Sequence, residues 1–238
     1  MKKWIPNALT LLNLFLGCCA LVALFNQDYL LAIGFIAGGL VADFLDGAVA
    51  RLLQVNSPLG KELDSFADMV TFGVVPGLIL YILIAEGFSG GDFSGQLQWS
   101  ALPAFLLSAF SGLRLAKFNL DTRQSQTFLG LPTPSATIFV VGLLLIWHFN
   151  SFGLSTSIEN PFLLYAVVLI LCYLLICEIP MFSFKLKALG WKGNEVRFSF
   201  LAISLLLVFL LKEAAVSAII LIYLLINISL HLSGRKVN

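Results

Sequence analysis

Charged residues are scarce in this chain of 238 residues. Asp, Glu, Lys and Arg together make up 11% of it, whereas an ordinary soluble domain carries about 25%. So few charges cannot cover the surface of a water-soluble fold of this length, and 59% of the residues are hydrophobic. We therefore expect most of the surface to face lipid and predict an integral membrane protein without a nucleic acid partner.

Cysteine and histidine are also rare, which argues against zinc sites and disulfides. The four cysteines lie in apolar runs and form no CxxC motif, so we interpret them as small, buried hydrophobic residues. They are Cys18, Cys19, Cys172 and Cys177. The two histidines, His148 and His231, lie near opposite ends of apolar runs and are interpreted as interfacial residues.

Long apolar runs are what the sequence has in abundance. A membrane-spanning helix needs about 20 apolar residues, within a range of about 17 to 25. Eight runs approach this length: Ala8–Phe25, Leu30–Leu53, Leu63–Ala85, Trp99–Lys117, Thr133–His148, Pro161–Ile179, Phe198–Leu211 and Ala214–Leu232. We predict an all-α, polytopic transmembrane bundle of about eight helices that forms one domain over residues 1–238. The fifth and seventh runs are short, so six helices with a re-entrant pair is the alternative.

Basic residues are distributed unequally between the two ends of this bundle. When the loops are assigned alternately to two sides, all 14 Lys and Arg residues except Lys212 fall on the side that holds both termini. The positive-inside rule predicts that this side is cytoplasmic. We therefore expect a protein of the cell membrane with both termini in the cytoplasm.

Four aspartates interrupt the apolar pattern at the cytoplasmic ends of the second and third runs. Asp43 and Asp46 share one helical face, and Asp64 and Asp68 share another, because residues three or four apart lie on one stripe. A turn around residues 56–58 would bring the pairs together. Ionised carboxylates at this depth cost about 2.5 to 3.5 kcal/mol each, and oxygen ligands alone suit Mg²⁺, Mn²⁺ or Ca²⁺. Two such ions bridged by carboxylates are typical of phosphoryl displacement.

Small residues and one arginine are interleaved with these aspartates. Gly47, Ala50 and Gly60 are expected to share one space, which would leave room for a nucleotide base and ribose. Arg51 has the geometry to bind a phosphate with both arms of its guanidinium. Close helix packing and a simple membrane anchor are the alternative interpretations of these residues.

From Asp43 to Asp68 the sequence matches D-x-x-D-G-x-x-A-R-x8-G-x-x-x-D-x-x-x-D at every fixed position. In this motif the chain resembles the CDP-alcohol phosphatidyltransferase family. The resemblance implies a six-helix catalytic core, often dimeric, two divalent cations (Mg²⁺ or Mn²⁺), and a lipid donor of the CDP-diacylglycerol or CDP-archaeol type. It implies an active site that faces the cytoplasm, with Asp68 as both metal ligand and general base. The other implied metal ligands are Asp43, Asp46 and Asp64, and the implied nucleotide site consists of Asp43, Asp46, Gly47, Ala50, Arg51 and Gly60.

A narrower resemblance concerns the acceptor alcohol. Residues 5–14, 64–73, 113–119 and 128–134 are similar to the membrane-embedded phosphatidylserine synthases of this family, which implies L-serine as the acceptor. The residues we associate with serine are Arg114, Lys117, Asn119, Gly130 and Pro132. The basic residues among them also suit an ordinary cytoplasmic loop. A sister enzyme that uses glycerol 3-phosphate or inositol phosphate is one alternative function, and a metal-coupled transporter is another.

Overall fold

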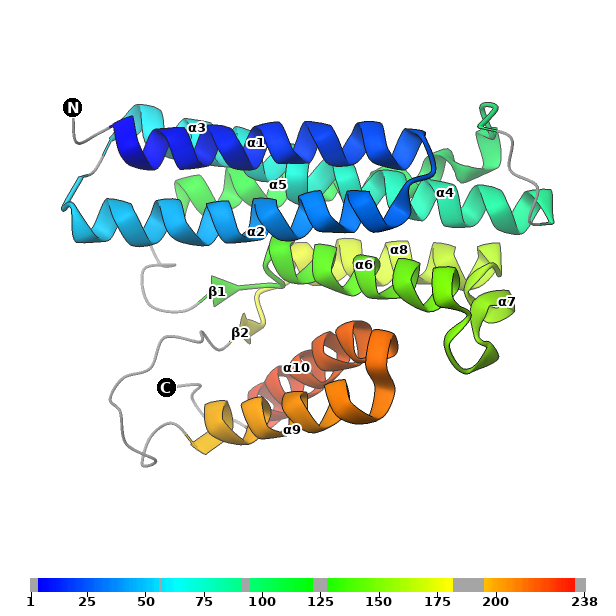
Figure 1. The fold of residues 1–238 in the computed structure, drawn as a ribbon. Coiled ribbons are helices and arrows are strands. Elements are labelled where there is room, and N and C mark those ends of the chain that lie inside the picture. The colour runs from blue at the N-terminus through cyan, green and yellow to red at the C-terminus, as the bar shows by residue number, and fades with distance from the viewer. Residues whose placement is uncertain (1–3, 56, 91–94, 122–127, 182–194, 234–238) are drawn as a thin grey trace.

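Eight long helical rods run back and forth in the part of the chain that the structure describes (Figure 1). The structure, a computed structural model, describes residues 4–55, 57–90, 95–121, 128–181 and 195–233. Six rods are single helices, and two consist of consecutive helical segments. The single ones are α1 (Trp4–Phe25), α2 (Tyr29–Leu52), α6 (Thr133–Phe149), α8 (Pro161–Ile176), α9 (Glu195–Leu211) and α10 (Ala215–Leu232). The composite ones are α3 (Pro58–Asp68) with η1 (Met69–Val74) and α4 (Val75–Ser89), and η2 (Trp99–Phe105) with α5 (Leu106–Leu120).

Short elements connect the rods. They are β1 (Phe128–Leu129), η4 (Ser151–Gly153), α7 (Ser155–Ile158), β2 (Pro180–Met181) and η5 (Lys212–Ala214). The all-α bundle predicted from the sequence is therefore confirmed, with one pair of two-residue strands added to it.

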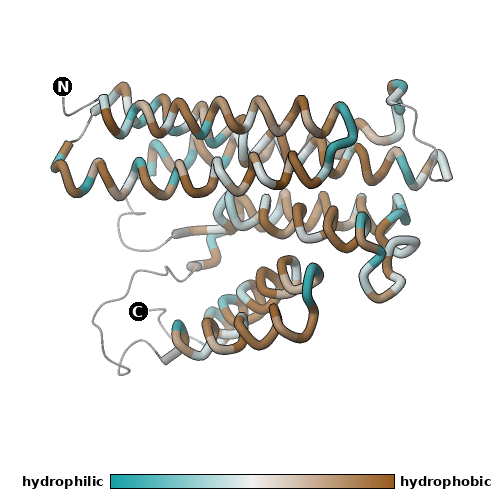
Figure 2. The backbone as a smooth tube through the Cα atoms, viewed as in Figure 1, coloured by the Kyte–Doolittle hydropathy of each residue, from teal (hydrophilic) through white to brown (hydrophobic). Residues whose placement is uncertain are grey.

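The outer faces of the rods are apolar, as a lipid environment requires. Phe25 is 82% exposed and Phe209 is 89% exposed. In Figure 2 the brown, hydrophobic colour extends along the helices, and teal concentrates at turns such as the one between α1 and α2. By length and composition five helices can cross a membrane: Trp4–Phe25, Tyr29–Leu52, Pro58–Ser89, Trp99–Leu120 and Val196–Leu232. Helices α6 and α8 are apolar but shorter, and the whole set fits an integral membrane protein.

The alternation of the rods gathers basic residues at one end. In Figure 1 the start of α1 and the end of α10 lie on the same side, and η5 with Lys212 lies on the other. Eight of the basic residues lie outside the described residues: Lys2, Lys3, Arg123, Lys185, Lys187, Lys192, Arg235 and Lys236.

Helix α4 forms the centre of the bundle. Every residue from Ile79 to Glu86 is buried, and α4 packs against α1, α5, α6 and α8. The cysteines follow the prediction only in part. Cys172 is buried, but Cys18 is exposed on the outer face of α1, where lipid can accommodate a small apolar side chain.

A π-helical segment, η1, interrupts the third rod directly after Asp68. Pro76 has no backbone N–H, so it cannot donate to the carbonyl of Phe72 one turn earlier. The hydroxyl of Thr137 on α6 donates to that carbonyl at 3.2 Å instead. The hydroxyl of Ser108 on α5 donates to the next carbonyl, that of Gly73, at 2.8 Å. Side chains of two neighbouring helices therefore hold the segment that follows Asp68.

The strands β1 and β2 join the loop before α6 to the segment after α8. They pair antiparallel, with Phe128 opposite Met181. Gly130 follows with φ of +74°, and a Cβ atom there would lie 2.8 Å from the carbonyl oxygens of Leu175 and Cys177. Only glycine combines this conformation with so close an approach to the end of α8.

Candidate active site

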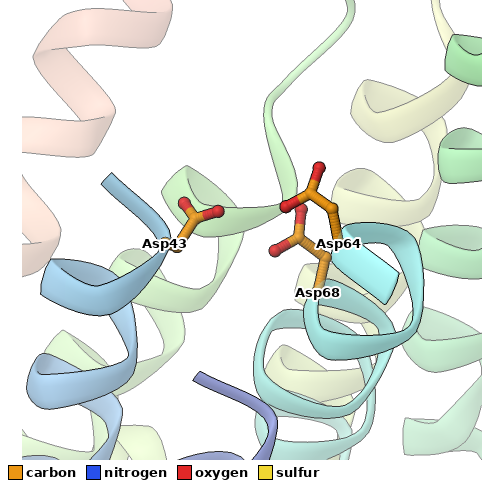
Figure 3. A group of neighbouring side chains, drawn as sticks. All are labelled: Asp43, Asp64 and Asp68. Atoms are coloured by element: carbon orange, nitrogen blue, oxygen red, sulfur yellow. The ribbon is translucent and has the colours of Figure 1, made fainter. Parts of the chain in front are cut away.

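Three carboxylates meet between α2 and α3. Asp43 comes from α2, and Asp64 and Asp68 come from successive turns of α3. One oxygen of each carboxylate lies within 4.8 Å of the other two. Figure 3 shows Asp43 pointing from the blue helix toward the two aspartates of the cyan helix. All three side chains are half-buried, so the repulsion between them is only partly screened by water.

Helix α1 holds the two motif helices in place. It packs against both α2 and α3, which make little backbone contact with each other. Helix α3 begins at the predicted place, because the hydroxyl of Ser57 caps it by accepting from the N–H of Gly60 and Pro58 occupies the first turn. Residue 56 of the predicted turn lies outside the described residues. The carboxylates therefore face each other across a gap whose floor is α1.

Asp46 has a different environment from the other three aspartates. It is 6% exposed, and its carboxylate accepts a hydrogen bond of 2.6 Å from the hydroxyl of Thr10 on α1. The sequence predicted four aspartates in one group, but the structure brings together three and places Asp46 beside them against α1. Thr10 was missed, although Asn7, Thr10 and Asn13 form a polar stripe at helical spacing in an otherwise apolar helix, and all three are buried.

A cavity of about 240 Å³ opens beside Asp46 and Asp64. Its lining residues come from α1, α2, α3 and the turn between the last two. They are Pro6, Asn7, Thr10, Asp46, Gly47, Ala50, Val55, Ser57, Gly60, Lys61 and Asp64. The prediction that Gly47, Ala50 and Gly60 share one space is therefore confirmed.

The surroundings of Gly47 show that it is not a helix-packing residue. Among the described residues, a Cβ atom there would meet only the guanidinium of Arg51, at 3.4 Å. No other helix of the described part of the chain therefore packs closely on α2 at this glycine. Arg51 is exposed and lies over Gly47 at the edge of the cavity.

A second cavity has a volume of about 310 Å³. Its lining includes Arg114 and Lys117 of α5 and the C-terminal end of α8. Arg114 is 7% exposed and interacts electrostatically with Asp68. Its Nε has no hydrogen-bond partner among the residues that the structure describes. Lys117 is exposed at the rim.

The family model for CDP-alcohol phosphatidyltransferases matches residues 3–177. The chain belongs to this family. The matched region contains α1 to α8 and all four motif aspartates, and the α9–α10 hairpin follows it. The resemblance inferred from the motif is thereby confirmed.

Relatives of the chain share one name, CDP-diacylglycerol–serine O-phosphatidyltransferase. The Helicobacter pylori protein is 32% identical over 228 residues, which cover 94% of this chain and 89% of that protein. The Bacillus subtilis protein is 35% identical over 186 residues, covering 78% of this chain and 94% of that protein. The Saccharomyces cerevisiae protein is 37% identical over 118 residues, covering 46% of this chain and 39% of that protein.

The carboxylate cluster of this family member fits a hard divalent cation. Asp43, Asp64 and Asp68 offer only oxygen ligands, within a space that one ion can span. Oδ1 of Asp68 is buried without a hydrogen-bond partner in the described part of the chain, which is a further sign of a ligand atom.

Three of the residues predicted to contact serine have structural contacts. The side-chain amide of Asn119 donates to the hydroxyl of Ser65 at 2.7 Å. The backbone carbonyl of Asn119 accepts from the ammonium of Lys61 at 2.9 Å. Asn119 thus ties α5 to α3. Gly130 packs on α8, and Pro132 is the N-cap residue of α6. A role of these three residues in serine binding stays a prediction.

Proposed function

We propose that this chain transfers the phosphatidyl group of CDP-diacylglycerol to L-serine and releases phosphatidylserine and CMP. The names of its relatives support this reaction. The observation that carries the proposal is that the carboxylate cluster has one member in the lining of the first cavity and a charged neighbour in the lining of the second. Asp64 lines the first cavity, and Asp68 interacts with Arg114, which lines the second. A transferase needs a donor site and an acceptor site that meet at the reacting phosphorus.

The first cavity is the proposed nucleotide site. Gly47, Ala50 and Gly60 leave its wall open, so a flat base and ribose can approach the helix backbone. Arg51 at the edge is placed to bind a phosphate oxygen. Bulk at Gly47 would fill the space that the nucleotide requires.

Two divalent cations, Mg²⁺ or Mn²⁺, complete the proposed site. Asp43, Asp64 and Asp68 would hold them together with Asp46, whose orientation Thr10 fixes. Bound cations would neutralise the diphosphate of the donor and the charge that develops on it.

Asp68 is the proposed general base. The serine hydroxyl oxygen attacks the lipid-bearing phosphorus, its proton passes to the Asp68 carboxylate, and the bond from that phosphorus to the bridging oxygen breaks. CMP leaves with the electron pair. A positioned base of this kind contributes about 100- to 10,000-fold to the rate. Arg114 would bind the serine carboxylate, with Lys117 as a second cation at the rim.

The setting of the reaction belongs to the same proposal. The basic end of the bundle, with the active site and both termini, faces the cytoplasm from the cell membrane. The chain works as a homodimer, as the family resemblance implies, and forms one catalytic domain. The donor has acyl tails, with the ether tails of a CDP-archaeol type as the variant.

Product analysis tests the proposal. Purified protein is given CDP-diacylglycerol and Mn²⁺ or Mg²⁺, separately with L-serine, glycerol 3-phosphate and inositol phosphate, and the lipids are resolved by thin-layer chromatography. We expect phosphatidylserine with an equal amount of CMP. A product from a phosphorylated acceptor alone would contradict the serine assignment, and the absence of any lipid product would favour the transporter.

A further inference from the structure

Two buried hydroxyl groups on α5 and α6 have no hydrogen-bond partner among the described residues. They belong to Ser111 on α5 and Thr133 at the start of α6, and each side chain is 1% exposed. Buried polar atoms are almost always paired in folded proteins. Hydroxyls enclosed without a partner indicate that a ligand supplies one.

Ser111 lies on the face of α5 that carries Arg114. The two residues are three apart and therefore share one helical stripe. On this stripe Ser108 bonds to the carbonyl of Gly73, and a Cβ atom at Gly73 would lie 3.2 Å from Cβ of Ser111. One turn further along, Arg114 interacts with Asp68. Ser111 thus faces the third rod just beyond Asp68.

Thr133 lies on α6, which packs against the third rod through η1 and α4. Thr137, one turn later, donates its hydroxyl to the carbonyl of Phe72. Helix α6 begins part-way along the third rod and runs in the same direction (Figure 1). Four residues before Thr137 is Thr133, and four residues before Phe72 is Asp68, so Thr133 and Asp68 lie at the same level.

We infer that Ser111 and Thr133 are specificity-determining residues that bind the ammonium group of the acceptor amino acid. The inference rests on the proposed function and deepens it. Hydroxyl oxygens accept hydrogen bonds from an ammonium group, whereas Arg114 is the complement of a carboxylate. Serine then has a partner for each of its three polar groups, with Asp68 next to its hydroxyl. Glycerol 3-phosphate has no ammonium group and would leave both hydroxyls unpaired, which disfavours its binding.

The chain offers matched controls for this inference. Ser108 and Thr137 are the same residue types, one turn away on the same two helices, and are also buried. The hydroxyl of Ser108 donates to the carbonyl of Gly73 at 2.8 Å, and that of Thr137 has the carbonyls of Phe72 at 3.2 Å and Thr133 at 3.0 Å as acceptors. Ser108 and Thr137 therefore represent hydroxyls whose role is structural.

The test compares Ser111→Ala and Thr133→Val with Ser108→Ala and Thr137→Val in the full-length protein. Steady-state rates are measured against both substrates, and thermal unfolding is measured with and without L-serine. We expect Ser111→Ala and Thr133→Val to raise the KM for serine at least about tenfold, since each removes a hydrogen bond to a charged group. Their KM for CDP-diacylglycerol and their unfolding midpoint without serine should stay at the wild-type values. The stabilisation by serine should disappear.

The control variants should show the opposite pattern. Ser108→Ala and Thr137→Val should unfold at lower temperature, because each removes a hydrogen bond from a buried backbone carbonyl, and should keep the wild-type KM for serine. The inference is overturned if Ser111→Ala and Thr133→Val keep the wild-type KM for serine, or if they lose stability as the controls do.

Two inert ligands separate this inference from the proposed function. L-Alanine keeps the ammonium and carboxylate of serine but lacks the attacking hydroxyl, and propanoate keeps only the carboxylate. Wild-type protein should be stabilised more by L-alanine than by propanoate, and this difference should vanish in Ser111→Ala and Thr133→Val. Equal effects of the two ligands on the wild type would overturn the ammonium site even if phosphatidylserine is formed. Failure to form phosphatidylserine would overturn the proposed function whatever the ligand data show.

Discussion

Asp68 has three chemically different surroundings. It lies one turn after Asp64, faces Asp43 across the gap between α2 and α3, and interacts with Arg114 beside the second cavity. The π-helical segment that follows it is held by side chains of α5 and α6. A carboxylate in this position can serve both the metal cluster and the acceptor, which is why we assign it both roles.

Removal of one charge from the cluster should abolish turnover. Asp43→Asn or Asp64→Asn replaces a carboxylate oxygen by an amide nitrogen that cannot bind a cation, and we expect a loss of at least about 100-fold in the rate of phosphatidylserine formation. The variants should also bind Mn²⁺ more weakly in a direct titration. Asp28→Asn is the control, because Asp28 caps α2 at the opposite end from the cluster, where its side chain accepts from the N–H of Leu31. Wild-type turnover in Asp43→Asn would remove that residue from the site.

The spacing of the aspartates in the sequence predicted that they form a site. It did not predict that three of them form the cluster while Asp46 bonds to α1. The spacing of three and four residues places each pair on a helical face, and this holds within any helix. The hydrogen bond that distinguishes Asp46 from the other three comes from Thr10, which is 36 positions away in the sequence. Likewise, Asn119 is engaged by Ser65 of α3. Such partners are determined by how the helices pack against one another. The periodicity within a single helix carries no information on that packing, so the sequence pattern could not predict them.

At the scale of elements, the π-helical segment also could be predicted only in part from the sequence. Pro76 within an apolar run predicts a missing donor for the carbonyl of Phe72. The donor that this carbonyl receives is the hydroxyl of Thr137, which belongs to another helix. The apolar run extends across both parts, so hydropathy alone merges them into one regular helix.

The close approach of Gly130 to α8 should contribute to the stability of the fold, and a second glycine offers a control variant. Gly130→Ala places a Cβ in a left-handed conformation, which costs roughly 1–2 kcal/mol, and presses it against carbonyl oxygens, which adds about 1–3 kcal/mol. Gly153 has φ of +70°, but no atom lies within 4 Å of the position that its Cβ would take, so Gly153→Ala should show only the first cost. Thermal unfolding midpoints measure the difference. Equal losses would mean that the approach to α8 does not contribute.

At the scale of the whole molecule, the bundle could be predicted because bilayer thickness dictates helix length. The helix ends differ from the prediction where the chain makes contacts outside the helix. The sixth run was expected to reach Ile179, but α8 ends at Ile176. The segment after Ile176 is extended because the N–H of Gly130 donates to the carbonyl of Ile179. The size of the bundle thus follows from composition, and its details follow from contacts between loops.

The orientation of the bundle gives a prediction of its own. Glu62 is exposed at the basic end, and Lys212 is exposed at the other end. In a variant whose four native cysteines are replaced by serine, we expect Lys212→Cys to react with a membrane-impermeant maleimide on intact cells. Glu62→Cys should react only after the cells are opened, because the basic end faces the cytoplasm. Labelling of Glu62→Cys on intact cells would reverse the proposed orientation.

The dependence of turnover on divalent cations tests the central claim most directly. Protein freed of metal with EDTA is titrated with Mn²⁺ or Mg²⁺ in the presence of CDP-diacylglycerol and L-serine, and phosphatidylserine is measured. If Asp43, Asp64 and Asp68 hold the cations that neutralise the donor diphosphate, activity should be absent in EDTA and return as a saturable function of either cation. Full turnover in excess EDTA would contradict the account.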